Sequence, residues 1–158
     1  MTGRVVAIAQ HDFGRLSADE VYQAWTDPAL LTRWMAEHLK EQDPAAALAR
    51  IEVSAAVGGR FFFADTREGS AAWGYYKALE RPKHIVFSWF VSPEEEQEDN
   101  SDVTIEITPA GAGCAVTITH EMSDEWADYV DRTAAAWRSM LQAMDGSAAG
   151  SLSSGVTP

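Results

Sequence analysis

The stretch DEWADYVDRTAAAWRSMLQAM, residues 124–144, decides the fold of this chain. Its large apolar residues recur at the spacing of an amphipathic helix about 30 Å long: Trp126, Tyr129, Val130, Trp137, Met140, Leu141 and Met144. The roughly seventy residues before it carry strand and turn patterns, so only a sheet is left to cover its aromatic stripe. We therefore expect an α+β fold in which a curved antiparallel sheet encloses one long C-terminal helix.

Seven segments upstream of this helix alternate apolar and polar residues with the period of two that is typical of strands. They cover residues 4–12, 51–55, 60–65, 72–80, 84–91, 102–108 and 114–121. Gly58 and Gly59 favour a tight hairpin turn between the second and third segments. The sheet is therefore expected to contain six to seven strands.

Two short helices are predicted between the first strand and the others. Ser17 and Glu20 have the spacing of a capping box, in which each side chain bonds the other residue's backbone N–H. Asp27 can cap a second helix that has Pro28 at its first position. The expected order is strand, two helices, six strands and the long helix.

The chain is long enough for one domain with a substantial core. We expect this domain to cover residues 1–146, because Gly146 is a plausible end for the last helix. Residues 147–158, SAAGSLSSGVTP, have the small and polar composition of a flexible tail.

Charge and composition exclude several classes of function. The formal net charge is −12, and the twelve basic residues are dispersed, which argues against nucleic acid and against anionic membrane surfaces. The chain has no apolar run of the ~20 residues that span a bilayer. A single cysteine, Cys114, allows no internal disulfide, and the N-terminus lacks a secretory signal. We therefore expect a cytoplasmic protein.

Several short motifs resemble those of one superfamily in their order and spacing. They are VYQAWTDPALLTRW at 21–34, Gly58–Gly59 before Phe61–Phe63, Gly74, Glu80–Pro82 before the aromatic strand at 85–89, the last two strands ending in His120, and Trp137 with Leu141. Together they resemble the START-like (SRPBCC) superfamily, and within it the family of the activator of the heat-shock-protein-90 ATPase. Ala136 and Gly113–Cys114 depart from the family pattern, which usually has Gly and Gly-Thr there.

The resemblance implies a helix-grip fold, in which the sheet and the C-terminal helix surround a cavity. Non-catalytic binding of a small hydrophobic molecule is the function we expect, and it requires a cavity above about 300 Å³ or a ligand that co-purifies with the protein. A chaperone-interacting module is the alternative, and it predicts a filled interior with an exposed apolar patch. A cyclase-like or hydrolase-like enzyme is the third and needs a polar partner for His120 in an open cavity. Monomer and homodimer both remain open.

The candidate ligand-binding residues are mainly aromatic. His120 continues the inward face of its strand, where it either contacts a ligand or is held by a structural hydrogen bond. The aromatic candidates either line a cavity or fill the core themselves: Phe61, Phe63, Trp73, Tyr75, Phe87, Trp89, Tyr129 and Trp137. Both faces of the strand at 72–80 carry aromatic residues, so the pattern does not decide which of them points inward.

No catalytic, metal or cofactor site is expected. The acidic segment at 94–102 lacks the alternating ligands and central Gly of a calcium loop, so it is interpreted as a solvated turn. The other histidines are isolated, without the spacing of a zinc site.

Overall fold

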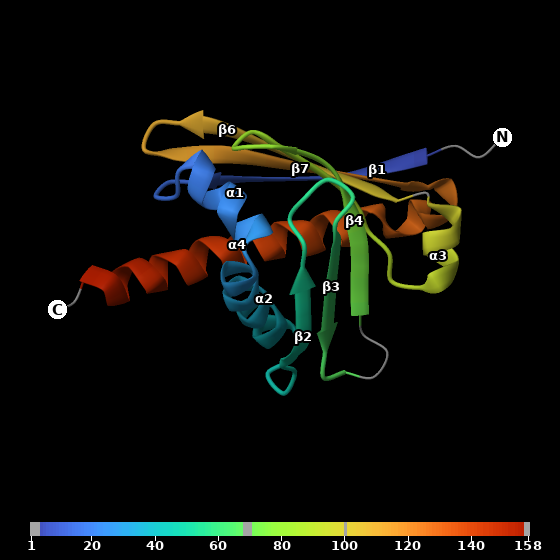
Figure 1. Ribbon diagram of the computed structural model, residues 1–158, viewed down its shortest axis with the longest axis horizontal. Helices are drawn as coiled ribbons and strands as arrows, with labels where there is room; N and C mark the ends of the chain where they lie inside the picture. The colour runs from blue at the N-terminus through green and yellow to red at the C-terminus, as the bar shows by residue number, and fades with distance from the viewer. Residues whose placement is uncertain (1–3, 68–70, 100, 157–158) are drawn as a thin grey trace.

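The computed structural model describes residues 4–67, 71–99 and 101–156, with 147–156 described by their backbone alone. Its elements are β1 (Arg4–Phe13), α1 (Ala18–Thr26), α2 (Pro28–Gln42), β2 (Leu48–Val53), β3 (Arg60–Asp65), β4 (Ala71–Glu80), β5 (His84–Ser88), α3 (Pro93–Glu98), β6 (Asp102–Ala110), β7 (Gly113–Ser123), the 3₁₀-helix η1 (Asp124–Tyr129) and α4 (Val130–Val156). The predicted α+β order is confirmed, with α3 and η1 as additions (Figure 1).

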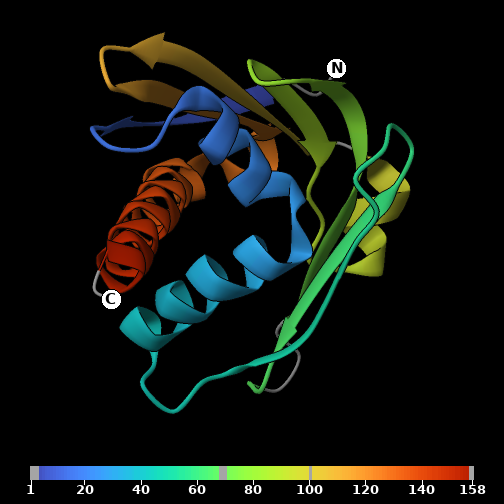
Figure 2. The ribbon, with the colours of Figure 1, turned by 60° about the vertical axis from the view of Figure 1, so that its left-hand side comes forward.

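The seven strands form one antiparallel sheet in the order β1-β7-β6-β5-β4-β3-β2. Figure 2 shows that the sheet curves around α4 and the two N-terminal helices, which together occupy its concave side. This is the predicted helix-grip architecture. Only β1 is placed out of sequence order, beside β7, so the first and last strands of the chain are neighbours.

Local signals account for the two N-terminal helices. Ser17 Oγ accepts from the Glu20 N–H at 3.1 Å, and Glu20 Oε1 accepts from the Ser17 N–H at 3.0 Å, which completes the predicted capping box. Asp27 Oδ1 accepts from the Ala29 N–H at 2.9 Å and caps α2. These bonds stabilise a sharp change of direction between α1 and α2, and both helices can therefore pack their apolar faces onto the sheet.

The core lies between the concave face of the sheet and the helices. The Trp34 indole is buried and donates to the Ala24 carbonyl at 2.8 Å, which ties α2 to α1. Ile105 and Ile118, paired across β6 and β7, are fully buried beneath the helices. Cys114 is buried as well, and this burial raises the pKa of its thiol to about 11, so the thiol is protonated and unreactive at neutral pH.

The C-terminal helix differs from its prediction at both ends. It begins as η1, and Trp126 departs from helical geometry with φ −98° and ψ 15°. Because of this kink, Trp126 and Tyr129 remain 37% and 43% exposed instead of joining the buried stripe. At the other end Gly146 does not take the left-handed conformation that ends helices, and the backbone continues as helix to Val156. The predicted helix end at Gly146 is therefore wrong.

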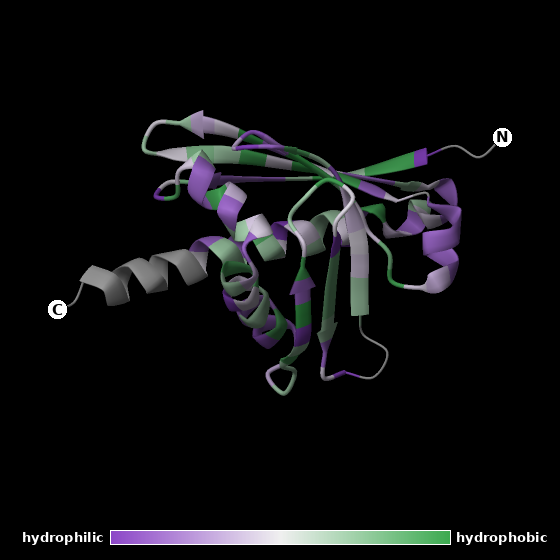
Figure 3. Ribbon diagram, in the orientation of Figure 1, coloured by the Kyte–Doolittle hydropathy of each residue, from purple (hydrophilic) through white to green (hydrophobic). Residues whose placement is uncertain are grey.

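The acidic segment also differs from its prediction. It forms the short helix α3, capped by Ser92, whose Oγ accepts from the Glu95 N–H at 3.2 Å. Most of its residues are hydrophilic (Figure 3). None of the helices within the described ranges has the length and apolar character needed to cross a membrane.

Candidate functional site

The space between the sheet and α4, where we predicted a ligand cavity, is filled by aromatic side chains. Trp89 and Trp137 lie edge to face with their centroids 5.0 Å apart, and Phe61 contacts Phe87 at 5.1 Å. Phe63 packs against Phe61 at 5.3 Å. The interior cavity left between them measures about 10 Å³, room for one water molecule at most. At this position the five aromatics act as core residues.

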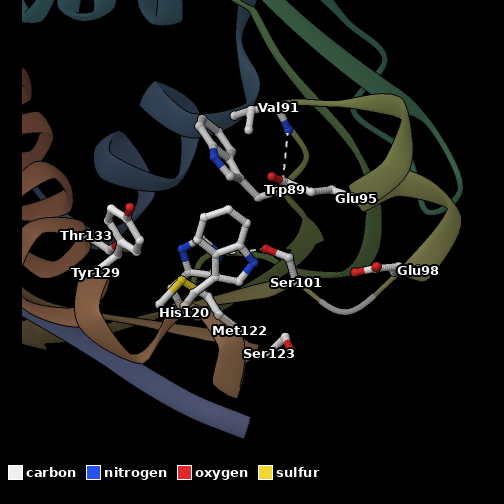
Figure 4. Close-up of a pocket in the computed structure, with 11 residues that line it drawn as sticks. Trp89, Val91, Glu95, Glu98, Ser101, His120, Met122, Ser123, Tyr129 and Thr133 are labelled. Carbon is white, nitrogen blue, oxygen red and sulfur yellow. Dashed lines mark hydrogen bonds between the residues drawn. The ribbon is translucent and has the colours of Figure 1, made fainter. Parts of the chain in front are cut away.

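An open pocket lies at one end of this core, and we call it the His120 pocket. Its volume is about 230 Å³, below the 300 Å³ expected from the sequence. It is lined by Trp89, Val91, Glu95, Glu98, Ser101, His120, Met122, Ser123, Trp126, Tyr129 and Thr133. Figure 4 shows β7 contributing His120 and Met122 and α3 contributing the two glutamates, while Tyr129 comes from η1 and Thr133 from α4. Three of the predicted site residues, Trp89, His120 and Tyr129, therefore meet in one pocket.

A second pocket of about 210 Å³ lies on the other side of Trp89, and we call it the His38 pocket. Its walls come from α2, β3, β4 and α4 and include Phe63, Met35 and Met140. Trp89 and Val91 line both pockets, and Trp89 also lines the interior cavity. The Trp89 indole thus separates three neighbouring spaces.

Two predicted cavity residues, Trp73 and Tyr75, lie on the opposite face of the sheet. Trp73 Nε1 donates to Glu96 Oε1 at 2.6 Å, and the Tyr75 hydroxyl donates to Glu96 Oε2 at 2.8 Å, so both rings support α3. In the pairing of β3 with β4, the buried Phe61 lies opposite Gly74. The inward face of β4 therefore carries Gly74 and the buried Tyr76, not Trp73 and Tyr75. The placement of Trp73 and Tyr75 in the cavity is therefore wrong.

His120 is held from two sides. The Trp137 indole Nε1–H donates to His120 Nδ1 at 3.0 Å, and His120 Nε2 lies 2.7 Å from Ser101 Oγ. The imidazole is 4% exposed, and its burial lowers its pKa to about 4 against a weaker opposing effect of Asp102. His120 is consequently neutral at neutral pH.

These two bonds fix the tautomer of the imidazole. An indole N–H can only donate, so Nδ1 accepts and Nε2 carries the ring proton. That proton is donated to Ser101 Oγ, whose own hydroxyl hydrogen is left to bond elsewhere. His120 therefore cannot take a proton from Ser101, which is what activation of a serine nucleophile requires. The pair presents a fixed hydroxyl, and the geometry does not support activation of Ser101 as a nucleophile by His120.

Glu95 is a second lining residue whose protonation is perturbed by its surroundings. Its Oε1 accepts from the Val91 N–H at 3.2 Å. Burial raises the pKa of its carboxyl, an effect opposed by the Val91 bond and reinforced by the nearby charges of Glu98, Glu125 and Glu94. The carboxylate is thus incompletely solvated and surrounded by like charge.

Sequence reasoning missed Ser101 and Glu95. Ser101 precedes β6 and has no motif around it, and its bond to His120 spans 19 positions of the chain. Glu95 belongs to the acidic segment that was interpreted as a solvated turn. The Ser92-Pro93 pair before three glutamates is a helix-start signal that could have placed Glu95 on an ordered helix.

Comparison with known proteins agrees with this architecture. Residues 15–148 match the family model described as Activator of Hsp90 ATPase homolog 1-like protein. No curated protein sequence matches the chain significantly.

Solved structures with the same fold cover nearly the whole chain. Protein NE0264 from Nitrosomonas europaea superposes with a TM-score of 0.73 at 12% identity, over 94% of this chain and 97% of that one. The AHSA1-like protein from Aeromonas hydrophila gives 0.70 at 18% identity, over 94% of each chain. The Aha1 dimer from Colwellia psychrerythraea gives 0.71 at 16% identity, over 89% of this chain and 93% of that one.

Proposed function

The chain belongs to the family of Activator of Hsp90 ATPase homolog 1-like proteins, and within this family we propose that it binds a small, largely apolar molecule in the His120 pocket without chemical conversion. The observation that carries the proposal is the hydrogen-bonded series Trp137–His120–Ser101, which fixes one hydroxyl in an otherwise largely apolar wall. Ligand pockets commonly combine apolar walls with a few well-placed polar groups of this kind.

The size of the pocket limits the ligand. A buried cavity of about 150 Å³ holds benzene, so 230 Å³ suits one aromatic ring with a short polar substituent. The ring would lie against Trp89, Met122 and Trp126, and the substituent would bond Ser101. Removal of the ring from water, worth about 25 cal/mol per Å² of apolar surface, supplies the main driving force.

Titration with benzyl alcohol tests this proposal. Trp89 and Trp126 line the pocket, so tryptophan fluorescence should change saturably with the alcohol, and calorimetry should give the same affinity. Ser101→Ala should weaken binding about fivefold through loss of one hydrogen bond. Ser139→Ala is a matched control, because Ser139 also lies near a histidine nitrogen, His38 Nδ1 at 3.4 Å, but lines none of the His120 pocket.

Two results would contradict the proposal. A fluorescence signal that rises linearly with benzyl alcohol, without saturation, would mean that the alcohol acts only as a cosolvent. Equal losses of affinity in Ser101→Ala and Ser139→Ala would mean that binding occurs outside the His120 pocket.

The chaperone-interacting alternative also has a specific observation in its favour. The interior is filled, and Trp126, Tyr129 and Val91 form an exposed apolar rim, as that alternative predicts. Addition of the purified protein to the heat-shock protein 90 of its own organism should then raise ATP hydrolysis, and Trp126→Ser should abolish the increase. Unchanged hydrolysis would remove this alternative. Light scattering of the purified protein alone decides between monomer and homodimer, the state named for the Colwellia protein.

A further inference from the structure

The charged groups in the wall of the His120 pocket are all acidic. Glu95 and Glu98 are the two ionisable carboxylates among its lining residues, and that lining includes no lysine or arginine in the described part of the chain. Both glutamates come from α3, on the side of the pocket opposite Tyr129 and Thr133 (Figure 4). A ligand in the pocket therefore meets negative charge along one wall and no compensating positive charge in the lining.

Glu95 is poorly neutralised. Its Oε1 accepts one hydrogen bond, from the Val91 backbone N–H at 3.2 Å, and acceptor capacity is left on both carboxylate oxygens. Glu94, Glu98 and Glu125 are close enough to repel it. A positive charge placed beside Glu95 would relieve this repulsion, whereas a carboxylate or phosphate there would add to it.

The remaining walls suit a cation as well as an apolar group. Trp126 and Tyr129 lie edge to face with their centroids 5.5 Å apart, and Trp89 forms a third aromatic wall. The faces of aromatic rings attract ammonium groups, and sites for organic cations commonly combine several rings with carboxylates. Tyr129 already attracts one cation: the Arg132 guanidinium lies 5.4 Å from its ring centroid, outside the pocket lining.

From this combination we infer that the His120 pocket selects organic cations, specifically single-ring or short-chain ammonium compounds, over neutral and anionic molecules of the same shape. The inference rests on the proposed function, because it assigns a charge class to the same ligand. The ammonium group lies between Glu95 and the aromatic rim, with Ser101 Oγ as a further acceptor. The net charge of −12 draws such cations toward the protein from a distance.

Three ligands with one ring and different charge test the inference. Benzylamine is a cation at neutral pH, benzyl alcohol is neutral, and benzoate is an anion. Benzylamine should bind at least about tenfold more tightly than the alcohol, through its charge-assisted contacts. Benzoate should bind more weakly than the alcohol. Raising the salt concentration to about 0.5 M should reduce the advantage of benzylamine and leave the alcohol unchanged.

Substitution of the glutamates locates the effect. Glu95→Gln keeps an oxygen that can accept from Val91 but removes the charge, so benzylamine should bind about fivefold more weakly while benzyl alcohol binds as before. Glu98→Gln should have a smaller effect in the same direction because Glu98 is exposed. Glu41→Gln on α2 changes the net charge equally and lies outside the pocket, so it should change neither affinity.

The outcomes separate the two proposals. Equal affinity for all three ligands, or equal losses in Glu95→Gln and Glu41→Gln, would overturn the charge inference and leave ligand binding intact. Failure of all three ligands to saturate would overturn the proposed function itself. A preference for benzylamine that falls most in Glu95→Gln, less in Glu98→Gln and not in Glu41→Gln supports both.

Discussion

The Trp137 indole donates to His120 Nδ1 at 3.0 Å, and this bond joins α4 to β7, the strand next to the edge strand β1. His120 lies between Ala7 of β1 and Val103 of β6 in the strand register. The bond therefore anchors the long helix to three strands at once. It also fixes the imidazole tautomer that holds Ser101, so the helix position and the polar wall of the pocket depend on one contact.

Trp137→Phe is expected to destabilise the protein by about 1–3 kcal/mol, because it keeps a ring in the core but leaves His120 Nδ1 buried without a donor. Urea unfolding followed by circular dichroism measures the change. Trp126→Phe is the matched control and should alter stability by less than about 0.5 kcal/mol, since Trp126 is 37% exposed. A Trp137→Phe protein as stable as this control would show that the bond contributes nothing net.

The low pKa of His120, about 4 in the folded state against 6.5 ordinarily, makes stability depend on pH. Between these values the unfolded chain binds a proton that the folded chain does not, so stability falls as pH falls through that window. From about pH 7 to pH 5 this histidine alone should account for a loss of about 2 kcal/mol. His38, whose pKa is also lowered by burial and by Arg67, adds to the loss. His120→Gln should flatten the dependence.

Nuclear magnetic resonance titration of the His120 ring tests the same prediction directly. Its resonances should remain those of a neutral imidazole down to about pH 5. A midpoint near the ordinary histidine value would contradict both the neutral state of His120 and the tautomer argument that depends on it.

The elements that the sequence predicted correctly are those set by neighbouring residues. Ser17 and Glu20 satisfy each other's backbone across one helical turn, and Asp27 caps α2 in the same local way. Alternation of apolar residues was sufficient to predict β7 with His120 on its inward face, because that face is buried along the whole strand.

The site was predicted less well because its contacts are long-range. Both faces of β4 carry aromatic rings, so the pattern does not decide which face points inward. The contacts that decide it are distant in the sequence: Tyr75 bonds Glu96, 21 positions away, and Gly74 lies opposite Phe61, 13 positions away. The segment that contains the kink at Trp126 has no proline or glycine that would have predicted it from the sequence. Pocket volume depends on how tightly rings such as Trp89 pack, which a pattern of residue types does not specify.

Gly74 is expected to tolerate no side chain. A Cβ there would lie 1.8 Å from the Ser88 carbonyl oxygen and 2.8 Å from Cζ of Phe61, so backbone as well as a core ring would have to move. Gly74→Ala should lower the free energy of unfolding by at least about 3 kcal/mol. Gly14→Ala is the control, because its Cβ would have no neighbour within 4 Å. Similar urea midpoints for the two variants would contradict the close approach of β4 to β5.

Trp89→Ala is expected to enlarge the range of ligands, because Trp89 separates the His120 pocket, the interior cavity and the His38 pocket. Without the indole these spaces should merge and admit a two-ring molecule such as 2-naphthalenemethanol, which should bind at least about tenfold more tightly than it binds the unsubstituted protein. The same change should cost about 3 kcal/mol of stability, and Trp89→Leu offers a milder variant if folding fails. Trp126→Ala removes an equal side chain from the exposed rim and should not admit the second ring. Equal gains in both tryptophan variants, or none in either, would show that Trp89 does not set the size limit.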